Sequence, residues 1–269
     1  MPARYVESFS SPEYEKFLQT CDTAVIGVAS IETHGPHLSL CADPLVGEGV
    51  LQRAADRVAT DANLVILPTI KYAIVLQHGH ERNPVYPGNI GVTESTLMAQ
   101  FMDIAGCLAR DGFRKLLIFN MHGGNSSIVP VIAHSLEREY PGLYCFHYMV
   151  TAGMNWGGFG EKSCGHGCAS ETSLNLALNP QYTWMETNPP ENEARRYAFE
   201  APAQASIFPD WCWVTRGHGY VGDPKLATAE AGERMIEGAL GVLVPTLEQL
   251  ARLDVSVYEP VERPNEMFV

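Results

Sequence analysis

Basic residues are scarce in this sequence, and their scarcity limits the partners it can have. The 269 residues include 18 Lys and Arg against 31 Asp and Glu, so the formal net charge is −13 and the pI is about 5.1. A nucleic-acid backbone is bound by clustered Lys and Arg, whereas here the few basic residues are spread along the chain. We therefore expect no nucleic-acid partner.

Long apolar runs and paired cysteines are missing as well. No stretch approaches the roughly 20 apolar residues that cross a bilayer. The opening residues, MPARYVESFSSPEYEKF, contain no apolar core of a secretory signal. The seven cysteines are irregularly spaced with no paired C-x-x-C, which favours thiols in a reducing compartment over disulfides or a structural zinc site. These absences predict a cytoplasmic protein without a membrane partner.

Apolar runs of strand length alternate with amphipathic stretches along the chain. Runs that are apolar on both faces are typical of central strands covered by helices. The alternation predicts one α/β domain over residues 1–269, with a mostly parallel, mixed sheet and helices on both faces. We expect residues 186–206, rich in Pro, Glu and Asn, to cross the surface. The expected strands are 23–29, 63–69, 115–120 and 143–149, and the expected helices are 44–58, 94–110, 126–139, 170–178 and 227–251.

The first polar cluster follows the run 23–29, where an open α/β sheet forms its sites. Glu32 and His34 stand two apart, so in an extended segment they face the same side. A carboxylate with an imidazole suits zinc, manganese or iron. Asp43 before Pro44 is typical of a helix N-cap, but its two oxygens would also allow it to bridge two cations. His37 is a candidate for orienting these ligands rather than binding metal.

The second cluster follows the run 115–120. His122 stands at a carboxyl strand end, the same edge as Glu32, and Gly123 and Gly124 allow the backbone to approach a ligand closely. A phosphate-binding turn is the alternative, but this turn lacks both G-x-G-x-x-G and G-x-x-x-x-G-K-[ST].

The third cluster begins with the Gly-rich aromatic stretch that contains Trp156, which is typical of a loop over a pocket. His166 follows as a candidate proton shuttle, and Glu171 as a candidate metal ligand or base. Alternatively, Ser170 or Glu171 caps the helix that follows, and His166 is an ordinary loop residue. No G-x-S-x-G elbow supports a serine nucleophile.

Together these motifs resemble the creatininase (creatinine amidohydrolase) family. The matching elements are Glu32-x-His34-Gly-Pro-His37-Leu, Asp43, Asn-Met-His122-Gly-Gly-Asn125 and His166-Gly-x-x-x-Glu171-Thr-Ser, in family order over residues 20–180, with GYVGDPKLATAEAGE at 219–233 also similar. The resemblance implies a three-layer α/β/α fold, two divalent cations and a homo-oligomer, commonly a hexamer.

The resemblance also implies a ligand set. Glu32 and His122 would hold one cation and His34 the other, with Asp43 bridging. True creatininases carry a glutamate two residues after the histidine that matches His122, whereas this chain has Gly124. Members with His-Gly-Gly-Asn supply that carboxylate from the Glu-Thr-Ser motif, which here is Glu171.

The Gly124 departure points away from creatinine and towards the broader relatives of the family. We expect hydrolysis of a C–N bond in a small, cyclic amide, lactam or formamide by a metal-activated water. Zinc is favoured, with manganese or iron as alternatives. His78 or His80, Trp156, Gly123 and Gly124 are candidates to contact the substrate. The alternatives are C–C hydrolysis of a cyclic ketone, a peptidase of the mycofactocin-precursor type, and a metal-dependent binding protein without catalysis.

Overall fold

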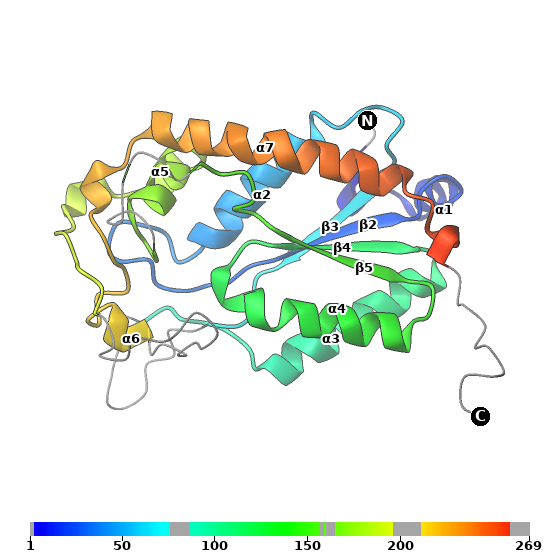
Figure 1. The fold of residues 1–269 in the computed structure, drawn as a ribbon, viewed down its shortest axis with the longest axis horizontal. Helices are drawn as coiled ribbons and strands as arrows, with labels where there is room; N and C mark the ends of the chain where they lie inside the picture. Colours follow the sequence, from blue (N-terminus) through cyan, green and yellow to red (C-terminus); the bar gives the residue numbers. More distant parts are fainter. Residues whose placement is uncertain (1–2, 76–86, 156–158, 160–164, 196–210, 259–269) are drawn as a thin grey trace, which may run out of the picture.

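Five parallel strands form the sheet of this protein. The computed structural model describes residues 3–75, 87–155, 159, 165–195 and 211–258 (Figure 1). The strands are β1 (Ala3–Tyr5), β2 (Thr23–Val28), β3 (Leu64–Ile70), β4 (Lys115–Asn120) and β5 (Tyr144–Met149), in the order β1-β3-β2-β4-β5. All four predicted strands are confirmed, and β1 is an addition.

The expected mostly parallel sheet is confirmed, and every strand pair among the described residues is parallel. One detail was wrong: we treated 143–149 as a central strand, whereas β5 lies at an edge and His147 on it is exposed. Its apolar residues reflect packing against the helices rather than a strand on either side.

The order of the strands creates a crevice between β2 and β4. From β2 the chain moves outward to β3 and then returns past β2 to form β4 on the other side. Thr23 pairs with Lys115 and Val28 with Asn120, so the two strands end together. The chain therefore leaves the carboxyl ends of β2 and β4 in opposite directions. The crevice between these two ends is the place where open α/β sheets bind ligands.

Helices cover both faces of the sheet, which gives the three-layer fold (Figure 1). The five predicted helices are confirmed, with shifted ends, and α1 and α6 are additions. The helices are α1 (Ser11–Leu18), α2 (Ala42–Ala55), α3 (Glu94–Arg110), α4 (Val129–Glu139), α5 (Ala169–Leu178), α6 (Trp211–Val214) and α7 (Ala229–Arg252). The expected start of α4 at residue 126 falls instead in the short 3₁₀ helix η2 (Gly123–Ser127).

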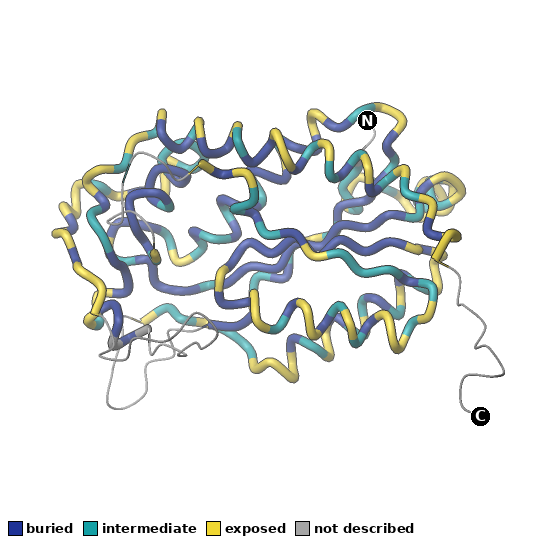
Figure 2. The backbone as a smooth tube through the Cα atoms, viewed as in Figure 1, coloured by how far each residue is buried: buried dark blue, intermediate teal, exposed yellow. Residues whose placement is uncertain are grey.

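The core consists of one apolar cluster on each face of the sheet. Successive residues of a strand alternate between them: Val25 packs with α2, α5 and α7, whereas Ala24 and Ile26 pack with α3 and α4. Figure 2 shows the central strands β2 and β4 buried along their length and the helices exposed on their outer faces.

Close backbone contacts hold α7 against the site end of the molecule. A Cβ at Gly232 would lie 2.0 Å from the carbonyl oxygen of Ser173 in α5. A Cβ at Gly238 would lie 2.5 Å from the carbonyl oxygen of Gly153, in the turn after β5. Only glycine allows these two approaches.

The other end of α7 is held by a buried lysine. The Lys115 ammonium, at the start of β4, donates to the carbonyl oxygens of Ala251 (3.2 Å) and Leu253 (2.9 Å). It also forms an ion pair of 2.9 Å with Asp22. A cation at a helix C-terminus satisfies carbonyls that the helix itself leaves unpaired.

Three expectations about the surface and the thiols can be compared with the structure. In the described part of the chain, no helix combines the length and apolar character that a membrane span requires. Residues 186–195, the described part of the predicted surface segment, are mostly exposed. Six of the seven cysteines lie in the described residues and none of these six forms a disulfide, while Cys164 lies outside them.

Candidate active site

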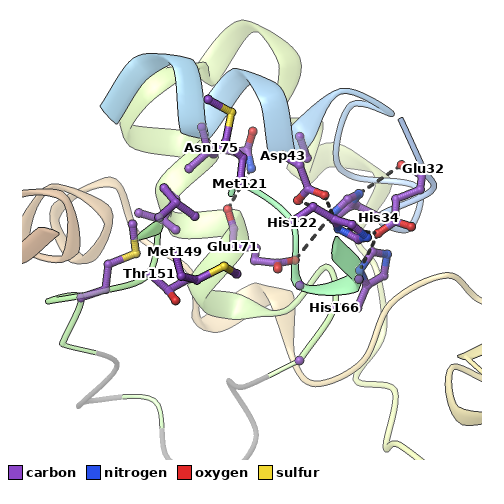
Figure 3. Close-up of a pocket in the computed structure, with 18 residues that line it drawn as sticks. Glu32, His34, Asp43, Met121, His122, Met149, Thr151, His166, Glu171 and Asn175 are labelled. Atoms are coloured by element: carbon purple, nitrogen blue, oxygen red, sulfur yellow. Dashed lines mark hydrogen bonds and ion pairs between the residues drawn. The ribbon is translucent and has the colours of Figure 1, made fainter. Parts of the chain in front are cut away.

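Six side chains from four loops and helix starts converge at the carboxyl ends of β2 and β4 (Figure 3). Glu32 and His34 follow β2, and His122 follows β4. The helix starts supply the rest: Asp43 from the first turn of α2, His166 from just before α5, and Glu171 from the first turn of α5. The structure thus brings together all the residues in which the sequence predicted metal or proton chemistry.

Asp43 lies at the centre of this group and contacts both flanking histidines. Its Oδ1 is 3.2 Å from His34 Nε2, and its Oδ2 is 2.7 Å from His122 Nδ1. The helix α2 begins at Ala42 with Cys41 as its N-cap, so Asp43 does not cap it. Of the two interpretations of Asp43, the geometry matches a carboxylate shared between two groups of donors.

One group of donors consists of Glu32, Asp43 and His122. Glu32 Oε1 is 3.4 Å from His122 Nδ1, and one donor atom from each of the three residues lies within 4.8 Å of the others. Glu32 is 1% exposed, and its Oε2 is buried without a hydrogen-bond partner among the described residues. A buried, unpartnered carboxylate oxygen is costly unless a cation or proton joins it.

A second group consists of His34, Asp43 and Glu171, again with donor atoms within 4.8 Å of one another. His34 Nε2 lies 3.8 Å from Glu171 Oε2. The opposite nitrogen, Nδ1, lies 3.1 Å from the backbone carbonyl of Glu32, which can fix the imidazole so that Nε2 faces the carboxylates. Such a partner on the second nitrogen is usual for a histidine that binds metal.

His166 lies beside the first group, and with Glu32 and His34 it forms a third group whose donor atoms lie within 4.8 Å of one another. Its Nε2 donates to the backbone carbonyl of Thr33 at 2.5 Å, and its Nδ1 is 3.5 Å from Glu32 Oε1. The ring packs against that of His34, with 4.1 Å between centroids. Since Nε2 is occupied by Thr33, Nδ1 is the nitrogen available to the donor cluster.

Burial and crowding shift the pKa values of the histidines. Burial would lower the pKa of His34, but Asp43, Glu171 and Glu32 raise it to about 10. Burial is likewise overcome at His122, where Glu32 and Asp43 raise the pKa to about 9. The pKa of His166 instead falls well below the ordinary value, because burial and the neighbouring His34 both disfavour its charge.

The carboxylates respond to the same environment. Burial raises the pKa of Glu32 to about 7, and removal from bulk water also raises that of Glu171. Burial would raise the pKa of Asp43 too, but His34 and His122 lower it below the ordinary value. The raised pKa values of His34 and His122 thus reflect the negative charge of the carboxylates beside them, which bound cations would also neutralise. The nitrogen and oxygen donors fit zinc, manganese or iron.

A tight turn fixes the residues that follow β2. Gly35 has a φ of +78°, and a Cβ there would lie 2.7 Å from the ring of Tyr220. His37 Nε2 donates to the carbonyl of Gly167 at 3.1 Å, which links this turn to the one that carries His166. Burial lowers the pKa of His37 to about 4, so it is neutral at pH 7. His37 lies outside both donor groups, consistent with the orienting part that the sequence suggested.

Glu171 also contacts the start of its own helix. Its Oε2 accepts a hydrogen bond of 2.6 Å from the backbone N–H of Gly167, one residue before the N-cap Cys168. The expected alternative that Ser170 or Glu171 is the cap was wrong, because α5 begins at Ala169 with Cys168 as its N-cap. A carboxylate has lone pairs enough for this bond and for a cation.

Asn125 holds the turn after His122 in place. Its Oδ1 accepts from the backbone N–H of Ile74 (3.2 Å), and its Nδ2 donates to the carbonyl of Ala29 (3.3 Å). The asparagine of the His-Gly-Gly-Asn motif thus ties the second cluster to the end of β2.

Comparison with known proteins identifies the family. The family model described as "Creatininase: Creatinine amidohydrolase" matches residues 7–247. The chain belongs to the creatininase family.

Two curated relatives and one solved structure show how far this creatininase-family chain resembles known members. Creatinine amidohydrolase from Pseudomonas putida is 28% identical over 251 residues, covering 87% of this chain and 92% of the relative. The 3-dehydro-scyllo-inosose hydrolase of Thermotoga maritima is 23% identical, covering 92% and 82%. A putative creatinine amidohydrolase from Bacteroides fragilis has the same fold, with a TM-score of 0.79 at 23% identity over 95% of this chain and 99% of that one. The chain is thus an enzyme of this amidohydrolase family, and the differing names of its relatives leave its substrate open.

A cavity of about 500 Å³ opens beside the donors of this creatininase-family site. Gly123 and Gly124 line it as predicted, and a Cβ at Gly123 would meet no atom within 4 Å, so open space lies next to this backbone. Trp156, His78 and His80, also predicted to shape the pocket, lie outside the described residues.

The sequence analysis missed the rest of the lining. The cavity wall also contains Ala42, Val46, Met121, Met149, Val150, Thr151, Met154, Gly165, Leu174 and Asn175. Asn175 could have been found, because it stands four residues after Glu171 and so on the same face of a helix. Met149 to Met154 gave no signal, because an apolar strand end and turn look the same whether they face a core or a ligand.

Proposed function

We propose that this chain uses two divalent cations to hydrolyse a C–N bond in a small, cyclic amide, lactam or formamide. The observation that carries the proposal is the pair of donor triads that share Asp43 at the mouth of a cavity. Two cations bridged by a carboxylate are a common arrangement for hydrolysis by activated water.

Each triad would hold one cation. Glu32 and His122 would bind the first and His34 and Glu171 the second, with Asp43 between them. True creatininases, which this chain resembles, carry a glutamate where this chain has Gly124. Glu171 of α5 would supply that carboxylate here instead. When bound, the two cations would acidify a water molecule and polarise the carbonyl of the substrate. We favour zinc, with manganese and iron as alternatives for the same donors.

A side chain of the protein would transfer the proton, and backbone N–H groups would stabilise the negative charge that develops on the substrate. His166, held through Nε2 by the Thr33 carbonyl, turns Nδ1 towards the donors, where it can carry a proton to the leaving nitrogen. The backbone N–H groups of Gly123 and Gly124 would donate to the carbonyl oxygen as it gains negative charge. The open space beside Gly123 admits the substrate to that position.

The test is a panel of lactams, formamides and cyclic ketones assayed with protein whose metals have been quantified. We expect two cations per chain, turnover of at least one amide class, and loss of both metal and activity in His122→Ala. Turnover of cyclic ketones alone would replace C–N by C–C hydrolysis. Full activity and metal content in His122→Ala would overturn the assignment of the site.

A further inference from the structure

The cavity has two unlike sides. In Figure 3 the donors Glu32 and His34 lie on one side, and Met149 and Thr151 on the other, with Glu171 between. Much of the remaining lining is apolar, and we define the apolar wall as Met121, Met149, Val150, Met154 and Leu174. Three of these five are methionines, whose flexible thioethers adapt to apolar groups of varied shape.

The apolar wall is held in position by the backbone. Val150 donates its N–H to the carbonyl of Asn120 at 2.9 Å, and Met154 donates to that of Thr151 at 3.0 Å. Between them, Gly153 has a φ of +79° and packs against the backbone of α7, where a Cβ on it would lie 2.6 Å from the Gly238 carbonyl. The wall therefore belongs to the packed structure.

Beyond the six candidate metal and proton residues, the described lining offers few polar side chains. These are Thr151 and Asn175. The Asn175 Nδ2 donates to the backbone carbonyl of Glu171 at 3.0 Å, whereas its Oδ1 is buried without a hydrogen-bond partner among the described residues and leaves one acceptor for a substrate N–H or hydroxyl. A ring with several hydroxyl groups would leave most of them without partners here, at a cost for each.

The described lining offers no partner to a charged substrate either. No Lys or Arg occurs in the described lining of the cavity. Three carboxylates and an attacking hydroxide would balance two divalent cations, so the loaded site would be nearly neutral. A carboxylate or phosphate on the substrate would gain nothing from the wall.

We propose that the substrate is a neutral amide bearing an alkyl or aryl group that lies against the apolar wall while its carbonyl reaches the donors. This inference rests on the proposed function and narrows its substrate class. The cavity volume of about 500 Å³ falls in the range of sites that enclose a ligand of drug size, so space remains for such a group.

The first test uses a single lactam ring with side chains from hydrogen to butyl, together with one hydroxylated and one carboxylated analogue. With metal-loaded protein we expect kcat/KM to rise about three- to fourfold per added methylene, and both polar analogues to fall below the methyl compound. A flat series, or a preference for either polar analogue, would overturn the proposal.

Binding separates failure of this inference from failure of the proposed function. The affinity of the metal-loaded protein for the same series is measured by calorimetry, whether or not turnover occurs. Affinity that rises with chain length without turnover supports the apolar wall but contradicts the proposed C–N hydrolysis. Affinity that is independent of chain length contradicts the wall even if the lactams are hydrolysed.

Variants identify the wall itself. Met149→Gln and Met154→Gln nearly preserve the side-chain volume but introduce an amide. We therefore expect the increase in kcat/KM per added methylene to disappear, while the metal content stays at two cations per chain. Met102→Gln is the control, because this partly buried methionine packs on the opposite face of the sheet, in the α3 and α4 cluster. The same loss in Met102→Gln would show a general effect on stability and overturn the assignment to the wall.

Discussion

At the scale of single residues, the site depends on the carboxylate that both donor triads share. Asp43 contacts the imidazoles of His34 and His122, which lower the pKa of its carboxyl below the ordinary value, whereas burial raises the pKa of Glu32 to about 7. The difference arises because Asp43 lies between two histidines, whereas burial dominates at Glu32. A carboxylate held in its charged form between two groups of donors fits the bridging part that we propose for Asp43.

Replacement of Glu171 should remove the second cation. We expect Glu171→Gln to bind one cation per chain and to lose on the order of 100-fold in kcat/KM, because an amide is a poorer metal ligand. Elemental analysis and a rate assay measure the two effects. The added substitution Gly124→Glu should recover part of both, since it returns the carboxylate to the position implied for true creatininases. Glu186→Gln, at an exposed position, is the control. Retention of two cations by Glu171→Gln would contradict this assignment.

His166 should affect rate without affecting metal content. We expect His166→Ala to keep two cations but to lose about 10²–10⁴-fold in kcat for amides with poor leaving groups. Amides whose nitrogen leaves without protonation should lose much less. Parallel assays on anilides of different basicity show the difference. Loss of a cation in His166→Ala would show that His166 binds metal and would contradict its role as a proton carrier.

Much of this residue-level picture could be predicted from the sequence. Residues 32, 34, 122, 166 and 171 each stand beside a strand end or helix start, and parallel strands bring such positions together. The link between the Asn89 side chain and the Thr33 N–H (2.8 Å) could not be predicted, because it joins residues 56 apart through an ordinary loop asparagine.

At the scale of elements, helix α5 positions Glu171, and α7 positions α5. The two helices touch through Gly232, whose approach to Ser173 leaves no room for a side chain. The sequence predicted both helices but not this crossing, because a glycine inside a helical pattern does not reveal what lies opposite. It also contained an unused signal for α1, since Ser10 and Glu13 form a capping box with side-chain and backbone bonds.

Gly232→Ala should separate α5 from α7. We expect a loss of about 1–3 kcal/mol in the free energy of unfolding, typical of overpacking, together with weaker binding of the second cation because Glu171 moves. Denaturant titration and metal titration measure the two effects.

Gly241→Ala in the same helix is the matched comparison. A Cβ there meets nothing within 4 Å, so the substitution should stabilise the protein by up to about 1 kcal/mol through helix propensity alone. Equal effects of the two substitutions would exclude the helix contact as the cause.

At the scale of the whole molecule, the candidate site draws on segments far apart in the sequence. Donors come from residues 32–43, 122 and 166–171, so they meet only when β2 and β4 have paired and α2 and α5 have packed beside them. Metal that binds this arrangement and not the unfolded chain stabilises the fold.

Chelation should therefore lower the melting temperature. For cations at about 100 times their dissociation constant, binding contributes roughly 2.7 kcal/mol per site. For a chain of this size, removal of two cations should lower Tm by about 10–20 °C. Scanning calorimetry with and without a chelator measures the shift, and added zinc should restore it. An unchanged Tm after verified metal removal would contradict the expectation that metal binding stabilises the folded protein.

The assembly state is a further prediction at this scale. The family resemblance implies a homo-oligomer, commonly a hexamer, and light scattering on the purified chain measures its mass. The order of the motifs in the sequence was enough to suggest the family. Contacts between copies of the chain could not be predicted, because the spacing of motifs within one chain says nothing about them.

The contact between Lys115 and the last turn of α7 has a consequence for biosynthesis. Apolar residues of β2, β3 and β4 pack with α7, whose carboxyl end meets Lys115 through the carbonyls of Ala251 and Leu253. A ribosome delivers those residues after all five strands. Until they emerge, the growing chain carries one sheet face without this helix and a lysine without two of its acceptors. The sheet therefore depends on α7 to become aggregation-resistant, and chains released before α7 is made should be recognised by chaperones and proteases.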